Sequence, residues 1–144
     1  MATGIQIVFD CADPAKLAAF WAAALHYKVQ DPPGGFASWS EFLKAQGVPE
    51  SEWNSASAAV DPDGKGPRIF FQRMATPKPG KNRLHIDINA SGGRGVTRGE
   101  QVKRVGAEVE RLVKLGARKQ KEWDEDGEFW VVMLDPEGNE FCVQ

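Results

Sequence analysis

The residues 5–25, IQIVFDCADPAKLAAFWAAAL, contain the clearest fold signal of this chain. Isoleucine or phenylalanine stands at every second position of its first six residues, which predicts a strand over 5–10 with one apolar face. Asp13 and Pro14 follow and are typical of a helix start, because aspartate accepts hydrogen bonds from free N–H groups and proline suits the first helical position. Apolar residues then recur at helical spacing, so the sequence predicts a helix over 14–26.

The same order of elements returns in the second half of the chain. NRLHIDI, residues 82–88, again alternates apolar and polar side chains and predicts a strand. Thr97 and Glu100 then have the spacing of a capping box, and an apolar stripe leads to Gly116, a natural helix end. A strand again leads into a helix.

Both halves also close in the same way. Asp61–Gly64 and Asp135–Gly138 are turn signals of the form DPxG, and each precedes a short apolar-polar strand, 68–72 and 140–144. The second half has two further strands, predicted at 117–122 and 128–134. We therefore expect one βαβββ module used twice.

The predicted fold class is α+β, with two tandem βαβββ modules at 1–76 and 80–144 in a single domain, 1–144. The first module carries an insertion at 32–58, where 40–45 and 49–53 read as short helical turns. An excess loop on a rigid scaffold is a common place for recognition. A packing flap over one end of the sheet remains equally open.

Composition narrows the class of function. Hydrophobic residues make up 42% and charged residues 26%, and the net charge of −2 is spread evenly over both halves. Nucleic-acid binding and membrane insertion are therefore not expected. The two cysteines, Cys11 and Cys142, have no metal-knuckle spacing, and two reduced thiols with no signal peptide predict a cytoplasmic protein.

Strand parity predicts a pocket on the sheet. If each helix covers the apolar face of its own strands, the opposite face collects mixed polar and aromatic side chains. A concave face of this kind is typical of small-molecule sites, although an ordinary solvated sheet face would carry a similar mixture. The residues expected on it are Gln6, Val8, Asp10, Arg68, Phe70 and Gln72 in the first module and His85, Asp87, Asn89, Glu140, Cys142 and Gln144 in the second.

The segments at 5–25, 82–88 and 129–143 (FWVVMLDPEGNEFCV) resemble the vicinal oxygen chelate superfamily, the group of glyoxalases, bleomycin-resistance proteins and extradiol dioxygenases. They are most similar to its glyoxalase-like domain proteins. The resemblance implies a paired glyoxalase-like fold, in which the modules form an open cup-shaped mixed sheet around one ligand site. It also implies that a homodimer is an open alternative to a monomer.

The resemblance further implies where a metal would bind. Metal-dependent members carry a histidine or glutamine in each first strand and a glutamate in each last strand; these positions hold Gln6 and His85, then Phe70 and Cys142. Divalent metals with hard oxygen ligands prefer carboxylates and imidazole. The set therefore disfavours a divalent metal, and a site at Gln6, His85 and Glu140 stays as the alternative.

Three functions follow from this chain. The first is a lyase, isomerase or oxygenase-type enzyme on a small oxygenated or aromatic metabolite, with His85, Asp87 and Glu140 as candidate catalytic residues. The second is a metal-free binding or sequestration protein of the bleomycin-resistance type, and the third is a non-catalytic interaction module. The candidate ligand pocket consists of Gln6, Val8, Trp39, Phe70, Gln72 and Cys142.

Overall fold

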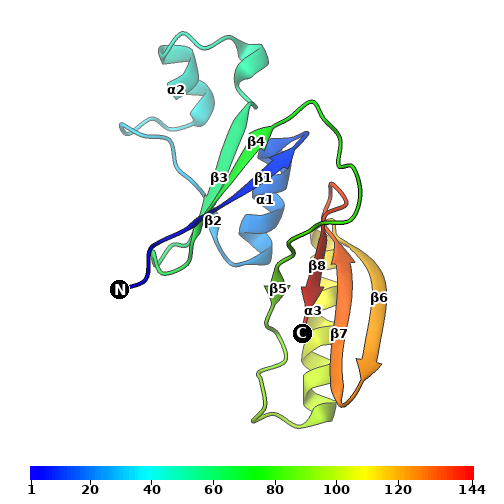
Figure 1. Ribbon diagram of the computed structural model, residues 1–144. Helices are drawn as coiled ribbons and strands as arrows, with labels where there is room; N and C mark the ends of the chain where they lie inside the picture. Colours follow the sequence, from blue (N-terminus) through cyan, green and yellow to red (C-terminus); the bar gives the residue numbers. More distant parts are fainter. The chain divides into compact units, whose positions relative to one another are not determined.

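The computed structural model describes residues 1–144 and divides into two compact units, unit 1 (Met1–Pro77) and unit 2 (Lys78–Gln144). Each unit contains one four-stranded mixed sheet with a helix on one face (Figure 1). The predicted α+β class with two βαβββ modules is confirmed.

Unit 1 holds the first sheet. Its elements are β1 (Gln6–Cys11), α1 (Pro14–Ala24), β2 (Lys28–Val29), α2 (Trp39–Ala45), a 3-10 turn η1 (Glu50–Glu52), β3 (Ala56–Val60) and β4 (Arg68–Arg73). The strand order is β1-β4-β3-β2, with β1 parallel to β4 and the other pairs antiparallel. The insertion at 32–58 therefore contains the two helical turns predicted for it.

Unit 2 repeats this topology. Its elements are β5 (Asp87–Ile88), α3 (Arg98–Leu115), β6 (Arg118–Glu125), β7 (Glu128–Leu134) and β8 (Glu140–Val143). The strand order β5-β8-β7-β6 again has one parallel pair, β5 with β8. The two strand orders correspond position by position, which shows the internal repeat directly.

The helix starts follow the predicted capping chemistry. The Asp13 carboxylate accepts a hydrogen bond from the Lys16 backbone N–H at 3.2 Å, with Pro14 in the first helical turn. The Thr97 hydroxyl accepts one from the Glu100 N–H at 3.4 Å. Each cap satisfies an N–H group that has no partner within its helix.

Helix α1 ends at Ala24, two residues before the predicted end. His26 takes the left-handed conformation with φ 57°, and the Tyr27 N–H donates to the Ala22 carbonyl at 2.8 Å. Helix α3 ends with the same motif at Gly116, with φ 115°. The corresponding position in the two modules is thus histidine in one and glycine in the other.

The helix-covered faces form the two cores. In unit 1, Ile69 and Phe71 of β4 are at most 1% exposed, and the Phe9 ring stacks on Phe71 and contacts Trp21 of α1. In unit 2, Phe141 and Val143 of β8 are fully buried, as the parity argument predicts. None of the helices combines the length and apolar character that a membrane span needs.

Two residues expected on these apolar faces are exposed instead. Ile5 is 72% exposed and Leu84 is 71% exposed, so their predicted burial is wrong. Gln6 pairs with the first residue of β4, and Ile5 lies one residue before that ladder. The pairing of Asp87 with Cys142 sets β8 in the same register, which leaves Leu84 before its first residue as well. The strand predicted within 82–88 is limited to Asp87–Ile88.

The two DPxG turns form as predicted. The Asp61 carboxylate accepts hydrogen bonds from the backbone N–H groups of residues 63, 65 and 66, and Gly64 has φ 68°. Asp135 accepts from residues 137 and 139 in the same way, and Gly138 has φ 82°. Asp135 is fully buried but satisfied by these bonds.

Candidate functional site

The face of the unit 1 sheet opposite α1 is built from paired residues of β1 and β4. Parallel pairing places Gln6 beside Arg68 and Val8 beside Phe70. The next pair is Asp10 and Gln72, joined by a 2.6 Å hydrogen bond from the Gln72 amide to the Asp10 carboxylate. The structure therefore brings together four of the predicted pocket residues, Gln6, Val8, Phe70 and Gln72, on one face.

Arg68 is the one cation among these pairs, and two amide oxygens fix its position. Its Nε donates to the Gln30 side chain and its Nη1 to the Gln6 side chain, both at 2.7 Å. The guanidinium carbon lies 5.3 Å from the centre of the Phe70 ring, in cation–π contact. Three of its five N–H donors remain available to a ligand.

A cavity of about 610 Å³ lies beside this arginine, wholly within unit 1. Its floor includes Ala56 and Ala58, whose small side chains share the face of Phe70 through antiparallel pairing. Its walls come from the insertion and from α1, β2 and β4. The lining includes Trp39, Leu43, Trp53, Asn54, Arg68 and Phe70. The volume is within the range of small-molecule sites.

The two tryptophans of the cavity are held by hydrogen bonds to the backbone. The Trp39 indole N–H donates to the Gln30 carbonyl at 2.6 Å, and the Trp53 indole N–H donates to the Val48 carbonyl at 2.9 Å. Trp39 also meets Phe42 edge to face, with ring centres 5.7 Å apart. Aromatic walls fixed in this way lose little conformational entropy when a ligand binds.

The charges around the cavity are unbalanced. Glu52 lines it, but this carboxylate is bound by the Arg73 guanidinium at 3.1 Å and by the Ser55 hydroxyl at 2.5 Å. Arg68 has amide partners and no carboxylate partner. The positive charge of Arg68 is therefore available to a negatively charged group in the cavity.

Asn54 ties the insertion to the start of α1. Its amide N–H donates to the Asp13 carboxylate at 2.8 Å, and its carbonyl accepts the Ala15 backbone N–H at 2.9 Å. The hydrogen bond from Asn54, followed by that from the Lys16 N–H, holds the pKa of the Asp13 carboxyl below its usual value. This contact fixes one rim of the cavity.

The corresponding face of unit 2 brings His85, Asp87 and Cys142 together. The His85 Nε2 lies 3.3 Å from an Asp87 carboxylate oxygen, and β5–β8 pairing sets Asp87 beside Cys142. One ligand atom from each of the three residues lies within 4.8 Å of the others. Burial raises the pKa of the Cys142 thiol, and the neighbouring Asp87 carboxylate raises it further.

Glu140, predicted as a catalytic residue and a metal ligand, already has partners. One carboxylate oxygen accepts the Asn82 backbone N–H at 2.9 Å, and the other lies 3.2 Å from the Lys78 ammonium. Burial raises the pKa of this carboxyl, but the bonds from Asn82 and Lys78 outweigh burial and hold the pKa below its usual value. The carboxylate stabilises the start of unit 2.

The residues present do not fit the oxygen-rich metal set that the resemblance implies. The Gln6 side-chain oxygen accepts a hydrogen bond from the Arg68 guanidinium, so a positive charge lies beside the oxygen that would bind a metal. Phe70 offers no ligand atom, and Glu140 is bound to Lys78. Within unit 2, the implied positions His85 and Cys142 have ligand atoms close to one another.

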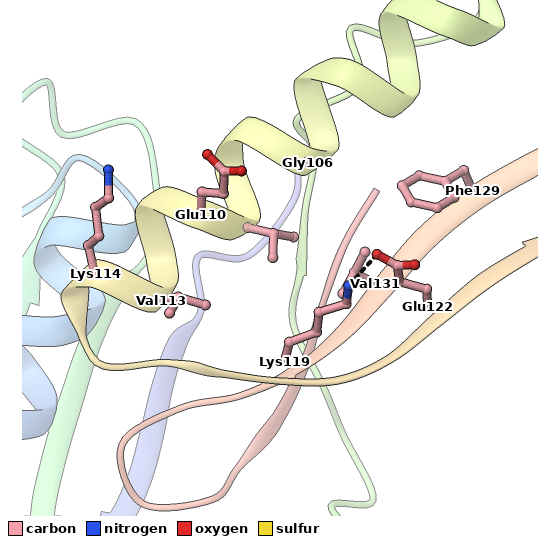
Figure 2. Close-up of a pocket in the computed structure, with 9 residues that line it drawn as sticks. Gly106, Glu110, Val113, Lys114, Lys119, Glu122, Phe129 and Val131 are labelled. Carbon is pink, nitrogen blue, oxygen red and sulfur yellow. Dashed lines mark hydrogen bonds and ion pairs between the residues drawn. The ribbon is translucent and has the colours of Figure 1, made fainter.

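Unit 2 has a cavity of its own, of about 450 Å³, between α3 and the β6–β7 hairpin. Figure 2 shows Gly106, Glu110 and Val113 of the helix facing Phe129 and Val131 of the sheet, with the Lys119–Glu122 ion pair beside them. No predicted site residue lines this cavity.

The outcome for the predicted pocket is mixed. Trp39 and Phe70 line the unit 1 cavity, Gln6 holds its arginine, and Val8 and Gln72 lie on the same sheet face without lining it. Cys142 belongs to unit 2. Sequence reasoning placed Arg68 on this face but did not select it, and it missed Gln30. The pairing of Gln6 with Arg68 was the signal available for Arg68.

Comparisons with known proteins agree with this architecture. Residues 6–144 match the family described as the glyoxalase-like domain. No curated protein matches the chain. Among solved structures, the fosfomycin resistance protein FosX from Listeria monocytogenes is similar, with 13% identity, a TM-score of 0.62, and coverage of 99% of this chain and 93% of that one.

Two further structures show the same fold. FosX from Mesorhizobium loti has 11% identity and a TM-score of 0.62, covering 100% of this chain and 92% of that one. A glyoxalase/bleomycin resistance protein/dioxygenase family enzyme from Burkholderia phytofirmans has 14% identity and a TM-score of 0.60, covering 96% and 94%. At these identities the likeness concerns the fold.

Proposed function

Since the chain belongs to the glyoxalase-like domain family, in the vicinal oxygen chelate superfamily, we propose that it binds a small, flat, negatively charged metabolite in the unit 1 cavity. The apolar walls would cover the body of the ligand, and Arg68 would bind its oxyanion. In this proposal the protein is a binding or sequestration protein that works without a metal.

One observation carries this proposal: Arg68 lines an aromatic cavity and has no acidic partner. A hydrogen bond to a charged group contributes about 1.5–3 kcal/mol, which corresponds to roughly tenfold to a hundredfold in affinity. The walls of Trp39, Trp53 and Phe70 suit a planar ligand, because aromatic rings stack on flat apolar surfaces.

One similar structure supports an anionic ligand by its printed description. FosX from Listeria monocytogenes is described in complex with Mn(II) and dihydroxypropylphosphonic acid, and is 15% identical to this chain. That ligand is a small oxygenated acid. The proposal keeps the acidic character of the ligand and assigns its recognition to Arg68.

Titration calorimetry with naphthoate tests the proposal. Naphthoate combines a planar apolar body with one carboxylate, and we expect it to bind with a stoichiometry of one. Arg68→Met should weaken binding at least tenfold, and Ala56→Leu should weaken it by filling the floor of the cavity. Arg94→Met, at an exposed loop position, is the matched control and should bind like the wild type. Unchanged affinity in both cavity variants would reject this site.

A second candidate function is acid–base catalysis, and the His85–Asp87 pair favours it. A carboxylate 3.3 Å from an imidazole nitrogen can orient the ring. Nitrobenzisoxazole is a suitable probe, because removal of one C–H proton by a base opens its N–O bond and releases a cyanophenolate. We expect turnover above that of free imidazole, lost in His85→Gln and kept in His26→Asn. A rate equal to that of imidazole would refute this candidate.

We also propose a homodimer and a cytoplasmic location. Strand β1 is an outer strand of its sheet, and the exposed apolar side chains of Ile5 and Val8 lie on or beside it. Outer strands with exposed apolar side chains favour association. Both cysteines are free thiols, which is typical of a reducing compartment. Light scattering that gives the mass of one chain would rule out the dimer, and cell fractionation checks the location.

A further inference from the structure

Gln30 directly follows β2 and is hydrogen-bonded to two groups that line the unit 1 cavity, Trp39 and Arg68. We propose that Gln30 is a positioning residue that also determines the charge preference of the site. Its neutral amide orients the Arg68 guanidinium without pairing the positive charge. This inference rests on the proposed anionic ligand and deepens it, because it names the residue that keeps the arginine available to that ligand.

Three hydrogen bonds hold Gln30 in place. Its backbone N–H donates to the Ala58 carbonyl at 2.9 Å, which continues the pairing of β2 with β3 by one residue. Its backbone carbonyl accepts the Trp39 indole N–H at 2.6 Å, and its side-chain oxygen accepts the Arg68 Nε–H at 2.7 Å. Because Ala58 lines the cavity as well, one residue connects the floor, an aromatic wall and the cation.

The bond at Nε determines which part of the guanidinium faces a ligand. A carboxylate can bind a guanidinium with two hydrogen bonds, either at Nε and one terminal nitrogen or at both terminal nitrogens. The Gln30 side chain occupies the Nε–H of Arg68, so the first arrangement is blocked. We therefore expect a ligand carboxylate to bind at the terminal nitrogens, Nη1 and Nη2.

The two amide partners of Arg68 are not equivalent. The hydrogen bond to Gln30 is partly buried, whereas the bond of equal length to Gln6 is exposed to solvent. A hydrogen bond in a less hydrated place is electrostatically stronger, because water competes less for its donor and acceptor. Gln30 should therefore hold the guanidinium more firmly than Gln6 does.

The acidic side chains around this contact have other partners. Asp31, the next residue in the chain, pairs with the Lys28 ammonium at 2.6 Å. Glu52, the carboxylate that lines the cavity, is bound by a different arginine. A carboxylate at position 30 would instead form an ion pair with Arg68 and compete with a ligand for its charge. The amide at this position therefore determines whether the cavity prefers an anion.

Calorimetric titration with naphthoate and its uncharged analogue naphthamide tests the role in specificity. The wild type should prefer naphthoate roughly tenfold to a hundredfold. Gln30→Glu, a nearly isosteric change that keeps both backbone bonds, should remove this preference by weakening naphthoate binding alone. Gln30→Met removes the acceptor but leaves the charge of Arg68 unpaired, so this variant should still prefer naphthoate. Gln120→Glu adds the same charge at an exposed position of β6 and should bind like the wild type.

Heteronuclear NMR of the labelled full chain tests the positioning role without any ligand. The bond to Gln30 should slow the exchange of the Arg68 Nε–H with water, so we expect a resolved signal that is absent in Arg68→Met. This signal should be lost or shifted in Gln30→Met. The Trp39 indole signal should remain in the same variant, because its acceptor is the backbone carbonyl, and it also shows that the variant is folded.

The outcomes separate this inference from the proposed function. An unchanged Arg68 signal in Gln30→Met, or a preference for naphthoate that survives in Gln30→Glu, overturns the inference while the proposed ligand site stands. Failure of the wild type to bind naphthoate overturns the proposed ligand and the role of Gln30 in specificity together. The NMR comparison then decides the positioning role by itself.

Discussion

The Asn54 contact links the insertion to the first turn of α1. Asn54→Ala removes two hydrogen bonds at once: the 2.8 Å bond to the Asp13 carboxylate and the 2.9 Å bond from the Ala15 N–H. The insertion then loses its tie to the first turn of α1. The lining of the cavity should loosen with it, because Asn54 stands at its rim.

The loss of stability in Asn54→Ala follows from the energies of these two hydrogen bonds. A hydrogen bond to a charged group contributes about 1.5–3 kcal/mol and a neutral one about 0.5–1.5 kcal/mol. Asp13 and Asn54 are half-buried, and the hydrogen bond from Ala15 is exposed. The low end of each energy range therefore applies. We therefore expect Asn54→Ala to lower the free energy of unfolding by about 2 kcal/mol.

The loss of stability in Asn54→Ala should depend on pH. The pKa of Asp13 in the folded protein is held below its usual value, first by Asn54 and then by Lys16. A carboxyl with a depressed folded pKa stabilises the protein above its unfolded pKa, and this stabilisation disappears as the pH falls through the folded pKa. The coupling between Asp13 and Asn54 is therefore complete at neutral pH and lost in acid, below about pH 4.

Urea unfolding of a double-mutant cycle at neutral and acid pH measures this coupling. Asp13→Asn is the matched variant, because it keeps a capping side chain without the charge. It should reduce the coupling to Asn54 and remove its pH dependence. The reasoning would be refuted if Asn54→Ala cost less than about 0.5 kcal/mol at neutral pH, or if the coupling were equal at both pH values.

Four further substitutions test the fold. His26→Gly should raise the free energy of unfolding by about 0.5–1 kcal/mol, because glycine suits the left-handed helix end as Gly116 does in α3; urea unfolding that shows a loss would contradict this. Gly106→Ala should stabilise α3 by up to about 1 kcal/mol, since an added Cβ has no neighbour within 4 Å. Phe141→Ala should cost about 3–5 kcal/mol in chemical denaturation, because its ring is fully buried. Glu140→Gln should destabilise at neutral pH and have less effect in acid, because the depressed pKa of Glu140 gives stability that is lost as the pH falls; an equal loss at both pH values would contradict that assignment.

Local chemistry in the sequence predicted the repeated module. Short stretches of sequence were sufficient to predict the two strand-to-helix segments and the two DPxG turns. Helix caps, turns and strand parity each depend on residues a few positions apart. Parity alone put Ile69 and Phe71 in the core, and their counterparts Phe141 and Val143 as well. The extent of strand pairing could not be predicted from the sequence. Strand β5 is short, and Leu84 is exposed because it lies before the residues that stand opposite β8.

The candidate site was less readable because it depends on contacts between distant residues. Trp39 and Trp53 could be expected at the site from their place in the insertion, but Gln30 joins it only through its hydrogen bond with the distant Arg68. The role of Arg68 depends on Glu52 being bound by Arg73, a pairing across 21 positions. Nothing in the local sequence indicates that Arg73 has a carboxylate partner and Arg68 does not.

The repeat itself holds information that a single module does not. His26 and Gly116 occupy the same place in the two helix-ending motifs, and Phe70 and Cys142 the same place in the last strands. Comparing such pairs shows where one module has specialised. In unit 1 the sheet face supports an aromatic cavity with an arginine, and in unit 2 it carries imidazole, carboxylate and thiol.

The proposed ligand site requires that the charge of Arg68 selects an anionic ligand in the unit 1 cavity. Calorimetric titration with naphthoate and with naphthamide, which has the same planar body without the charge, tests it most directly. The wild type should bind naphthoate roughly tenfold to a hundredfold more tightly than naphthamide, with the difference lost in Arg68→Met. Equal affinity for the two compounds, failure of naphthoate to bind, or a preference that survives in Arg68→Met would contradict it.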